Sequence, residues 1–410
     1  MALVTASESN AGIARLARAV AGSLVRVGPA WLTVSASLAL SLIGVHAIDI
    51  GASVTPHAVT VLGPLATRQL IFIAAGVLAA GAVCLPHYRV LGYASWVLFG
   101  VALAMLVFLL VPGVPSFIVR PRNGARSWID LGAVDLQPSE LAKIAWVMAL
   151  AWYLRYKENH RTFRGLLPPA IITGIPVGLI LLQPDMGTAL LFIPSLFAVL
   201  VAAGAKLKHL VVVVVLAALA APAAYPLLMP HQKARIVGLF QQFSGDRRGD
   251  LDINMQSVTA QRLAGAGGAW GLDQARSRTL VRFNALPERH NDMIFAVVCN
   301  RFGFVGGVAV LGLYLLWAVG AVWTAALCRE PFGRLVPVGL TGFILSQAVI
   351  NIGMNVGLLP IIGITLPFVS HGGSSMLASW IMTGLVWGIA LRRPKVTMRR
   401  SFEWDDEASG

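Results

Sequence analysis

Three short segments of this 410-residue chain combine ionisable side chains with strongly apolar neighbours. Glu140 and Lys143 lie in QPSELAK, Asp185 lies in QPDMGTALL, and Asp292 lies in PERHNDMIFAVV. A carboxylate can take a proton from a reacting hydroxyl, and a lysine or arginine can bind phosphate oxygens. Ionisable groups within an apolar span cost about 2.5–3.5 kcal/mol each on insertion scales, so they usually mark a functional site.

Each of these residues also has a purely structural interpretation. Glu140 and Lys143 are three residues apart, so they share a helix face and can neutralise each other as an ion pair. Asp185 can cap the helix that follows it, and Asp292 can do the same with Asn291 as a competitor. These alternatives stay open at the level of the sequence, since a cap or an ion pair can also serve a function.

Cationic and aromatic residues accompany the carboxylates. Arg126 and Trp128 precede QPSELAK, and Arg289 and His290 come directly before NDMIF. The crowding of Arg289 and His290 beside Asp292 indicates a candidate acid–base cluster. His371 lies in LPFVSHGGSS, where Pro and Gly break helix around an expected cavity. A lone histidine can titrate near neutral pH, but its role is more often structural.

The elements that must position these residues are membrane helices. Hydrophobic residues make up 57% of the chain and charged residues 12%, and the mean hydropathy is +0.75. A water-soluble globule could not bury so much apolar side chain, so a soluble enzyme, a disordered chain and a collagen-like fibre are excluded. The net charge of +14 is explained by basic loops that orient a membrane protein, with membrane lipids as partners and no nucleic acid.

The apolar runs predict an all-α, polytopic membrane helix bundle of about ten transmembrane helices. The fifth and sixth spans are short, and the eighth is long enough to kink or to extend past the membrane. One long outer segment, 230–291, separates the seventh span from the eighth, and we expect short amphipathic helices within it. The expected spans are 30–48, 68–85, 90–111, 138–156, 166–182, 186–203, 209–229, 292–325, 335–359 and 374–391.

The same pattern divides the chain into an N-terminal tail (1–29), a transmembrane domain (30–393) and a C-terminal tail (394–410). With both tails in the cytoplasm, the inner segments hold seventeen Lys and Arg, whereas the four short outer loops hold four. This is a strong positive-inside bias, and it places every candidate residue on the outer side. We therefore expect one outward-facing polar site that binds an anionic lipid headgroup and contains a carboxylate for proton transfer.

Other kinds of site find little support in the sequence. No GxGxxG or P-loop spacing follows an expected strand, which argues against a nucleotide site. Cys84, Cys299 and Cys328 all lie in apolar stretches, which indicates packing residues and not a disulfide framework or a metal cluster. No internal repeat is visible, which argues mildly against an inverted-repeat transporter.

Five motifs, in order along the chain, resemble the SEDS family (shape, elongation, division and sporulation) of bacterial peptidoglycan polymerases. The resemblance covers about 30–393, and the Arg289–His290 pair is more similar to the RodA branch than to the FtsW branch. The motifs are NGARSWIDLG at 123–132, QPSELAK at 137–143, QPDMGTALL at 183–191, LPERHNDMIFA at 286–296 and NIGMNVGLLPIIGITLPFVSHGGSS at 351–375.

The resemblance implies a glycosyltransferase of the bacterial inner membrane that polymerises lipid II. The 4-hydroxyl of one sugar would attack the anomeric carbon of another, and undecaprenyl pyrophosphate would leave. The family's essential aspartate falls on Asp292, which would act as the general base toward the acceptor hydroxyl. The implied partner is a class B penicillin-binding protein, a transpeptidase that crosslinks the glycan strands.

The remaining motif residues would bind the substrate. Positive charge must stabilise the leaving pyrophosphate, and Arg126 and Lys143 are the candidates, with Arg289 behind them. Glu140 and Asp185 match motif acids that shape the pocket or hold a divalent cation such as Mg²⁺, although no complete set of metal ligands is assigned. The predicted substrate-binding residues are Arg126, Trp128, Glu140, Lys143, Asp185, Arg289 and His290.

The sequence departs from the family pattern at a few positions and leaves two other function classes open. Cys299 and Asn300 stand where the family usually has paired acids, and His371 stands where it usually has tyrosine. A lipid II carrier (flippase) would need charges along a path to both sides, but the deepest charge found is Arg301. A non-catalytic scaffold for a transpeptidase is disfavoured by the presence of Asp292.

Overall fold

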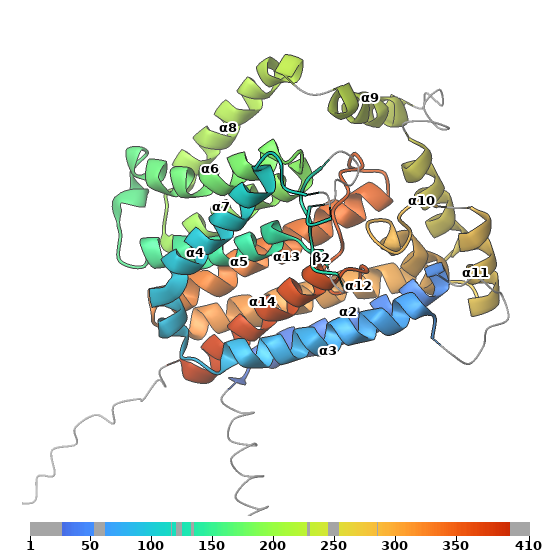
Figure 1. Ribbon diagram of the computed structural model, residues 1–410, viewed down its shortest axis with the longest axis horizontal. Helices are drawn as coiled ribbons and strands as arrows, with labels where there is room; N and C mark the ends of the chain where they lie inside the picture. Colours follow the sequence, from blue (N-terminus) through green and yellow to red (C-terminus); the bar gives the residue numbers. More distant parts are fainter. Residues whose placement is uncertain are drawn as a thin grey trace, which may run out of the picture.

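The computed structural model describes residues 27–52, 62–115, 117–119, 125–132, 135–227, 230–244, 254–284 and 286–393 (Figure 1). The predicted tails, 1–29 and 394–410, lie outside these ranges except for Val27, Gly28 and Pro29. The membrane helices are α2 (Ala30–Ala52), α3 (Pro64–Cys84), α4 (Tyr88–Leu110), α5 (Pro138–Leu154), α6 (Leu167–Leu182), α7 (Met186–Ala203), α8 (Leu207–Ala224), α12 (Ile294–Leu327), α13 (Pro331–Asn355) and α14 (Gly373–Arg392). The outer segment contains α9 (Pro230–Ser244), α10 (Met255–Ala266) and α11 (Gln274–Phe283).

Helices occupy all ten predicted spans, so the predicted all-α bundle is confirmed. In the described part of the chain, eight of these helices are long and apolar enough to cross a membrane. The other two are α5, with 17 residues, and α8, which is apolar over Leu207–Ala220. A 17-residue helix is about 26 Å long, close to the thickness of the hydrocarbon layer, so α5 can still cross beside longer neighbours.

The predicted kink in the long eighth span is present in α12. Gly303 has φ +70° and ψ −167°, which interrupts the 34-residue helix. An added Cβ at Gly303 would lie 2.4 Å from the carbonyl oxygen of Ala269, in the turn after α10. Only glycine combines this backbone conformation with so close an approach. The break in α12 is therefore also the place where the outer segment packs against this helix.

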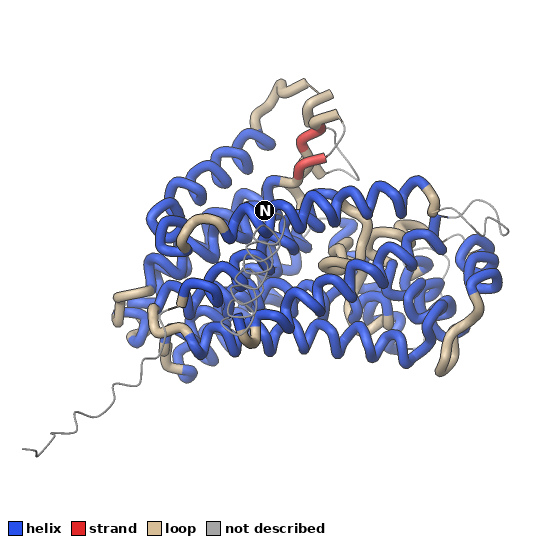
Figure 2. Tube along the Cα trace, turned by 90° about the horizontal axis from the view of Figure 1, so that it is seen from below, coloured by secondary structure: helices blue, strands red, loops and turns tan. Residues whose placement is uncertain are grey.

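The long helices lie side by side in a bundle (Figures 1 and 2). α14 packs along α3, α12 along α2, α13 along α7 and α12, and α4 along α5. A continuous apolar core joins these helices. By contrast α8 stands at the periphery of the bundle (Figure 1), and its residues from Val211 to Leu216 are exposed, as expected for a helix that faces lipid.

Contacts between loops agree with the predicted alternation of the spans. At one end, which we call the outer end, Gln69 of α3 donates to the carbonyl of Ser370, and Gln137 donates to Asp185. At the opposite, inner end, the His160 ring hydrogen-bonds the Ala203 carbonyl. The first and last membrane helices both have their free ends here, since the rings of Trp31 and Trp387 are 5.0 Å apart.

Two short features cover the outer end. The strands β1 (Ile129–Asp130) and β2 (Asp135–Leu136) pair antiparallel, and Figure 2 shows this hairpin beside the long helices. The predicted helices in the outer segment are confirmed as α9, α10 and α11. Of these, α10 packs on α12, and α11 packs on α2 and α12, so the outer segment is attached to the helix that follows Asp292.

Candidate active site

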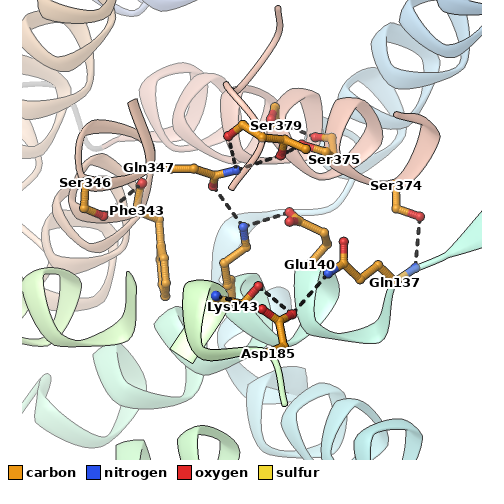
Figure 3. Close-up of polar contacts among 12 residues, drawn as sticks. Gln137, Glu140, Lys143, Asp185, Phe343, Ser346, Gln347, Ser374, Ser375 and Ser379 are labelled. Atoms are coloured by element: carbon orange, nitrogen blue, oxygen red, sulfur yellow. Dashed lines mark hydrogen bonds and ion pairs between the residues drawn. The ribbon is translucent and has the colours of Figure 1, made fainter. Parts of the chain in front are cut away.

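The first turn of α5 carries the predicted Glu140–Lys143 ion pair. Pro138 occupies the first helical position, where its missing N–H leaves no bond unmade. Lys143 Nζ lies 2.8 Å from Glu140 Oε2, and the two residues are only 1% and 5% exposed. Lys143 also donates to Gln347 Oε1 of α13 at 3.0 Å (Figure 3). An ammonium group has three donors, so one donor of Lys143 remains for a ligand.

Asp185 is the N-cap of α7, as one of its two interpretations predicted. Its carboxylate accepts from the Thr188 N–H at 3.0 Å and from the Thr188 hydroxyl at 2.8 Å. Gln137, just before α5, donates to the same carboxylate at 3.4 Å. Burial raises the pKa of Asp185, and the bonds from Thr188 oppose that shift. Figure 3 shows Glu140, Lys143 and Asp185 gathered around the start of α5.

An irregular segment, 356–372, connects α13 and α14 and borders this cluster. Gln347, which holds Lys143, donates its Nε2 to the carbonyl of Thr365 at 3.0 Å. Ile362 and Ile364 pack against the start of α7, where an added Cβ at Gly187 would lie about 3 Å from each side chain. Irregular backbone at this depth is tolerated only where protein buries it or a cavity adjoins it.

Asp292 reaches the same irregular segment from the other side. The residue is 8% exposed, and an added Cβ at Gly363 would lie 3.8 Å from Asp292 Oδ2. The α12 cap is Met293, without a side-chain cap hydrogen bond, so the interpretation of Asp292 as an N-cap is wrong. Its main-chain carbonyl is held instead by Asn351 and Asn355 of α13, at 2.8 and 2.9 Å.

Residues 362–365 are therefore the common neighbour of three predicted site residues or their immediate surroundings, those of Lys143, Asp185 and Asp292. Lys143 reaches Thr365 through Gln347, the α7 turn capped by Asp185 packs on Ile364, and Asp292 lies against Gly363. The convergence expected from the sequence is thus present in the fold. Whether these side chains bind substrate stays a prediction.

The two histidines near Asp292 lie together. The rings of His290 and His371 are 6.1 Å apart, and the His371 N–H donates to the His290 carbonyl at 2.8 Å. Burial lowers the pKa of His371 to about 4, with smaller contributions from His290 and Arg68. Burial also lowers the pKa of His290, against an opposing effect of Glu288. Both imidazoles are therefore neutral at pH 7.

Arg289 lies beside the outer end of α2. The stem of its side chain packs against Gly51 at the outer end of α2. A role of Arg289 in binding pyrophosphate would therefore require a ligand that extends from α5 toward α2.

Arg126 and Trp128 lie in the irregular segment that leads into the β1–β2 hairpin, and both are half-buried. The hairpin is tied to α14, because the Ser374 hydroxyl donates to the Asp135 carbonyl at 2.6 Å and accepts from the Gln137 N–H at 3.0 Å. The buried Nε of Arg126 has no hydrogen-bond partner within the described chain. A buried donor of this kind is costly unless something satisfies it, which suits an anionic ligand.

The polar face of α13 was missed by sequence reasoning. Gln347, Asn351 and Asn355 are spaced four residues apart and are 4%, 0% and 0% exposed. This spacing places three amides on one face of an otherwise apolar helix, and that signal was available in the sequence. Their partners lie on α5, on α12 and in the 356–372 segment, so the face joins the two halves of the site.

Cys299 and Asn300, which stand where the family usually has paired acids, are not part of the candidate site. Asn300 donates to the Leu263 carbonyl of α10 at 2.8 Å and accepts from the Ser277 hydroxyl of α11 at 2.7 Å. A buried ion pair from Arg278 of α11 to Asp49 of α2, at 2.6 Å, also fastens the outer segment. Sequence reasoning missed these attachments, because the two partners of each are far apart in the chain.

The residues predicted as ligands of a divalent cation do not fit one in their present arrangement. Glu140 is already paired with an ammonium group at 2.8 Å, and a cation beside Lys143 would be repelled. The described residues contain no group of three or more His, Cys, Asp or Glu that could hold a metal ion. The divalent cation therefore stays a prediction.

Known proteins resemble this chain over most of its length. Stage V sporulation protein E of Bacillus subtilis is 33% identical over 329 residues, which cover 79% of this chain and 86% of that protein. A probable peptidoglycan glycosyltransferase FtsW of Thioalkalivibrio sulfidiphilus is 34% identical and covers 78% of each chain. A chain from a solved peptidoglycan synthase complex that coordinates polymerization and crosslinking is 32% identical, with a TM-score of 0.73, covering 88% of this chain and 97% of that chain.

The family model for cell cycle proteins of the FtsW, RodA and SpoVE type matches residues 30–395. The match spans the bundle and every predicted site residue, and it agrees with an integral membrane protein built of many apolar helices. The model covers the three branches together, so the predicted closeness to the RodA branch is not distinguished. The chain belongs to the FtsW, RodA and SpoVE family, which is the SEDS family that its motifs resemble.

Proposed function

We propose that this protein is a peptidoglycan glycosyltransferase that polymerises lipid II at the outer face of the bacterial cytoplasmic membrane. One observation carries the proposal: the carboxylate of Asp292 adjoins the irregular 362–365 segment, whose other side contacts the Lys143–Gln347 pair. A base and a cationic group thus border one segment at the outer end. The relative named a probable peptidoglycan glycosyltransferase supports the same reaction class.

In the proposed reaction, Asp292 accepts the proton of the acceptor sugar's 4-hydroxyl. The hydroxyl oxygen forms a bond to the anomeric carbon of the donor sugar, and the bond from that carbon to the pyrophosphate oxygen breaks. Undecaprenyl pyrophosphate leaves with the bonding electrons. General-base catalysis of this type supplies about 10²–10⁴-fold in rate, and the remaining stabilisation must come from positive groups near the leaving oxygens.

Arg126 and Lys143 are the proposed partners of the pyrophosphate. The buried Nε of Arg126 lacks a protein partner among the described residues, and Lys143 retains one donor after binding Glu140 and Gln347. A guanidinium and an ammonium group both bind phosphate oxygens strongly in a site from which water is excluded. Trp128 would contact the sugar or lipid beside Arg126.

The proposed orientation has both tails in the cytoplasm. The basic residues of the short inner loops support it, as does the contact of Trp31 with Trp387 at one end of the bundle. The proposed partner is a class B penicillin-binding protein, because a similar chain occurs in a complex that coordinates polymerization with crosslinking. The described ion pairs Arg89–Glu330 and Arg161–Glu158 lie at the surface of the inner end, which favours a one-sided site over a carrier.

A polymerisation assay tests this function. The protein is purified with its cognate transpeptidase, labelled lipid II is added, and glycan strands are resolved on a gel. We expect long strands from the wild type and none from Asp292→Ala, with Asp273→Ala as a control, since Asp273 is an exposed cap of α11. Equal product from Asp292→Ala would remove the base assignment. No product from the wild type, beside an active reference polymerase, would favour a carrier or a scaffold.

A further inference from the structure

The first turn of α12 lacks a regular hydrogen bond at the position of Asp292. In an α-helix the carbonyl of residue i accepts from the N–H of residue i+4, which here would join Asp292 to Ala296. The Ala296 N–H donates instead to Asn355 Oδ1 at 3.2 Å. The Asp292 carbonyl accepts from Asn355 Nδ2 at 2.9 Å. The carboxamide of Asn355 is therefore inserted between the two ends of the missing bond.

Asn351 adds a second brace to the same carbonyl. Its Nδ2 donates to the Asp292 carbonyl at 2.8 Å and to the Ile364 carbonyl at 2.6 Å. Ile364 follows Gly363, the residue whose added Cβ would lie 3.8 Å from Asp292 Oδ2. Asn355 Nδ2 also donates to the Asn351 carbonyl at 2.9 Å, so one amide supports the other. The two amides thus connect the backbone of Asp292 to the irregular segment beside its carboxylate.

We infer that Asn355 and Asn351 are positioning residues that hold the Asp292 carboxylate in its reactive place by keeping residue 292 out of α12. The helix begins at Ile294, and its cap Met293 has φ −98° and ψ 15°. Without Asn355, the Asp292 carbonyl can bond directly to the Ala296 N–H. Residue 292 would then join the helix, and its side chain would turn away from Gly363. The inference rests on the proposed role of Asp292 as the base.

A purely structural role of the two amides makes a different prediction. Buried polar groups on the backbone need partners, and the two asparagines bond four of them: the Ala296 N–H and the carbonyls of Asp292, Ile364 and Asn351. If that were their whole purpose, their removal would lower the melting temperature, but folded molecules would turn over at the normal rate. A positioning role instead predicts a loss of kcat in folded protein with little change in KM, because a displacement of about 1 Å at a reacting group can cost about 10²-fold.

The test compares Asn355→Ala and Asn351→Ala with the wild type, in complex with the transpeptidase and with lipid II as substrate. Thr341→Val is the matched control: Thr341 lies on the same helix, is 6% exposed, and donates only to Pro337 one turn away. We expect kcat to fall at least tenfold in both asparagine variants, with KM changed less than threefold. The control should keep both parameters within twofold. A kcat within twofold of the wild type in folded Asn355→Ala would overturn the inference.

Two further readouts keep the result decisive. If Asn355→Ala is not recovered folded, Asn351→Ala carries the kinetic test, since it leaves the inserted amide in place. A solved structure of either variant should show residue 292 displaced from Gly363, and an unmoved Asp292 would overturn the inference without any activity measurement. Failure of the proposed function is distinguishable, because it appears as an inactive wild type or an active Asp292→Ala.

Discussion

Two ion pairs at the outer end of the bundle are buried, in contrast to the pairs of the inner end, whereas the Arg276–Asp273 pair of α11 is exposed. Lys143 pairs with Glu140, and Arg278 pairs with Asp49. All four side chains are at most 7% exposed. Removing two charges from water costs several kcal/mol per ion, and their attraction repays this only when the geometry and the additional hydrogen bonds are good.

The inner end uses the same residue types at its surface. Arg89 and Glu330 are 55% and 12% exposed, and Arg161 and Glu158 are 55% and 79% exposed. Pairs of this kind contribute about 0–1 kcal/mol, and basic residues next to membrane spans in general help to orient a membrane protein. The difference teaches that burial, and not the presence of charge, separates a candidate site from an anchoring surface.

The largest expected effect is on catalysis at the outer end. Asp292→Asn keeps the shape of the side chain but removes the base, so we expect kcat to fall by about 10²–10⁴-fold with a normal melting temperature. Glycan strand formation by the complex with the transpeptidase measures this. Asp273→Asn, which changes an exposed carboxylate of the outer segment, should leave the rate unchanged. An active Asp292→Asn would mean that the burial of Asp292 serves structure alone.

A slightly smaller effect is expected on stability. Lys143→Met leaves the carboxylate of Glu140 buried without its partner, which should cost about 3–5 kcal/mol. The double variant Lys143→Met with Glu140→Gln removes both charges and should recover most of that stability. Thermal unfolding in detergent measures both. If the single and double variants unfold at the same temperature, the buried pair is not the stabilising unit that the contrast between the two ends implies.

The fold and the charged part of the site were predictable because both leave strong local signals. Ten apolar runs predicted ten helices, and the rare carboxylates within those runs marked Glu140, Asp185 and Asp292. The i,i+3 spacing of Glu140 and Lys143 correctly predicted their ion pair. These inferences need only the chain near each residue and the low tolerance of apolar surroundings for charge.

The parts that were missed or wrong depend on contacts between distant segments. The interpretation of Asp292 as a helix cap failed because Asn355, 63 residues away, occupies its first turn. The Asp49–Arg278 pair joins residues 229 positions apart. Inserting a neutral amide such as Asn351 into an apolar run also costs less free energy than inserting a charge. Such an amide is therefore a weaker sign of function in the sequence. Non-local hydrogen bonds of this kind follow from the packing of the bundle.

A more moderate effect is expected from acid. Folded His371 has a pKa of about 4, because its site is buried, whereas the usual value is 6.5. Between these values the unfolded chain binds a proton that the folded protein does not, so stability should fall as the pH drops from 6.5 toward 4. Above pH 6.5 His371 should contribute no pH dependence.

His371→Gln tests this at the outer end. The variant should lose less of its melting temperature between pH 6.5 and pH 4.5 than the wild type. Some dependence should remain, because burial lowers the pKa of His290 in the same direction. If the melting temperatures of His371→Gln and the wild type fell in parallel as the pH is lowered, His371 would be as accessible to water as the charged groups of the inner end.

The smallest expected effect lies at the inner end itself. Arg89→Gln breaks the contact with Glu330 at 2.9 Å, but the Arg89 side chain is 55% exposed to water, so the free energy of unfolding should change by less than about 1 kcal/mol. The change should diminish further in high salt, because exposed charges are screened. Thermal unfolding at low and high salt, beside Lys143→Met, measures the contrast directly. If Arg89→Gln lowered the free energy of unfolding as much as Lys143→Met does, the Arg89–Glu330 pair would behave as a buried pair. Solvent exposure would then not distinguish the two ends of the bundle.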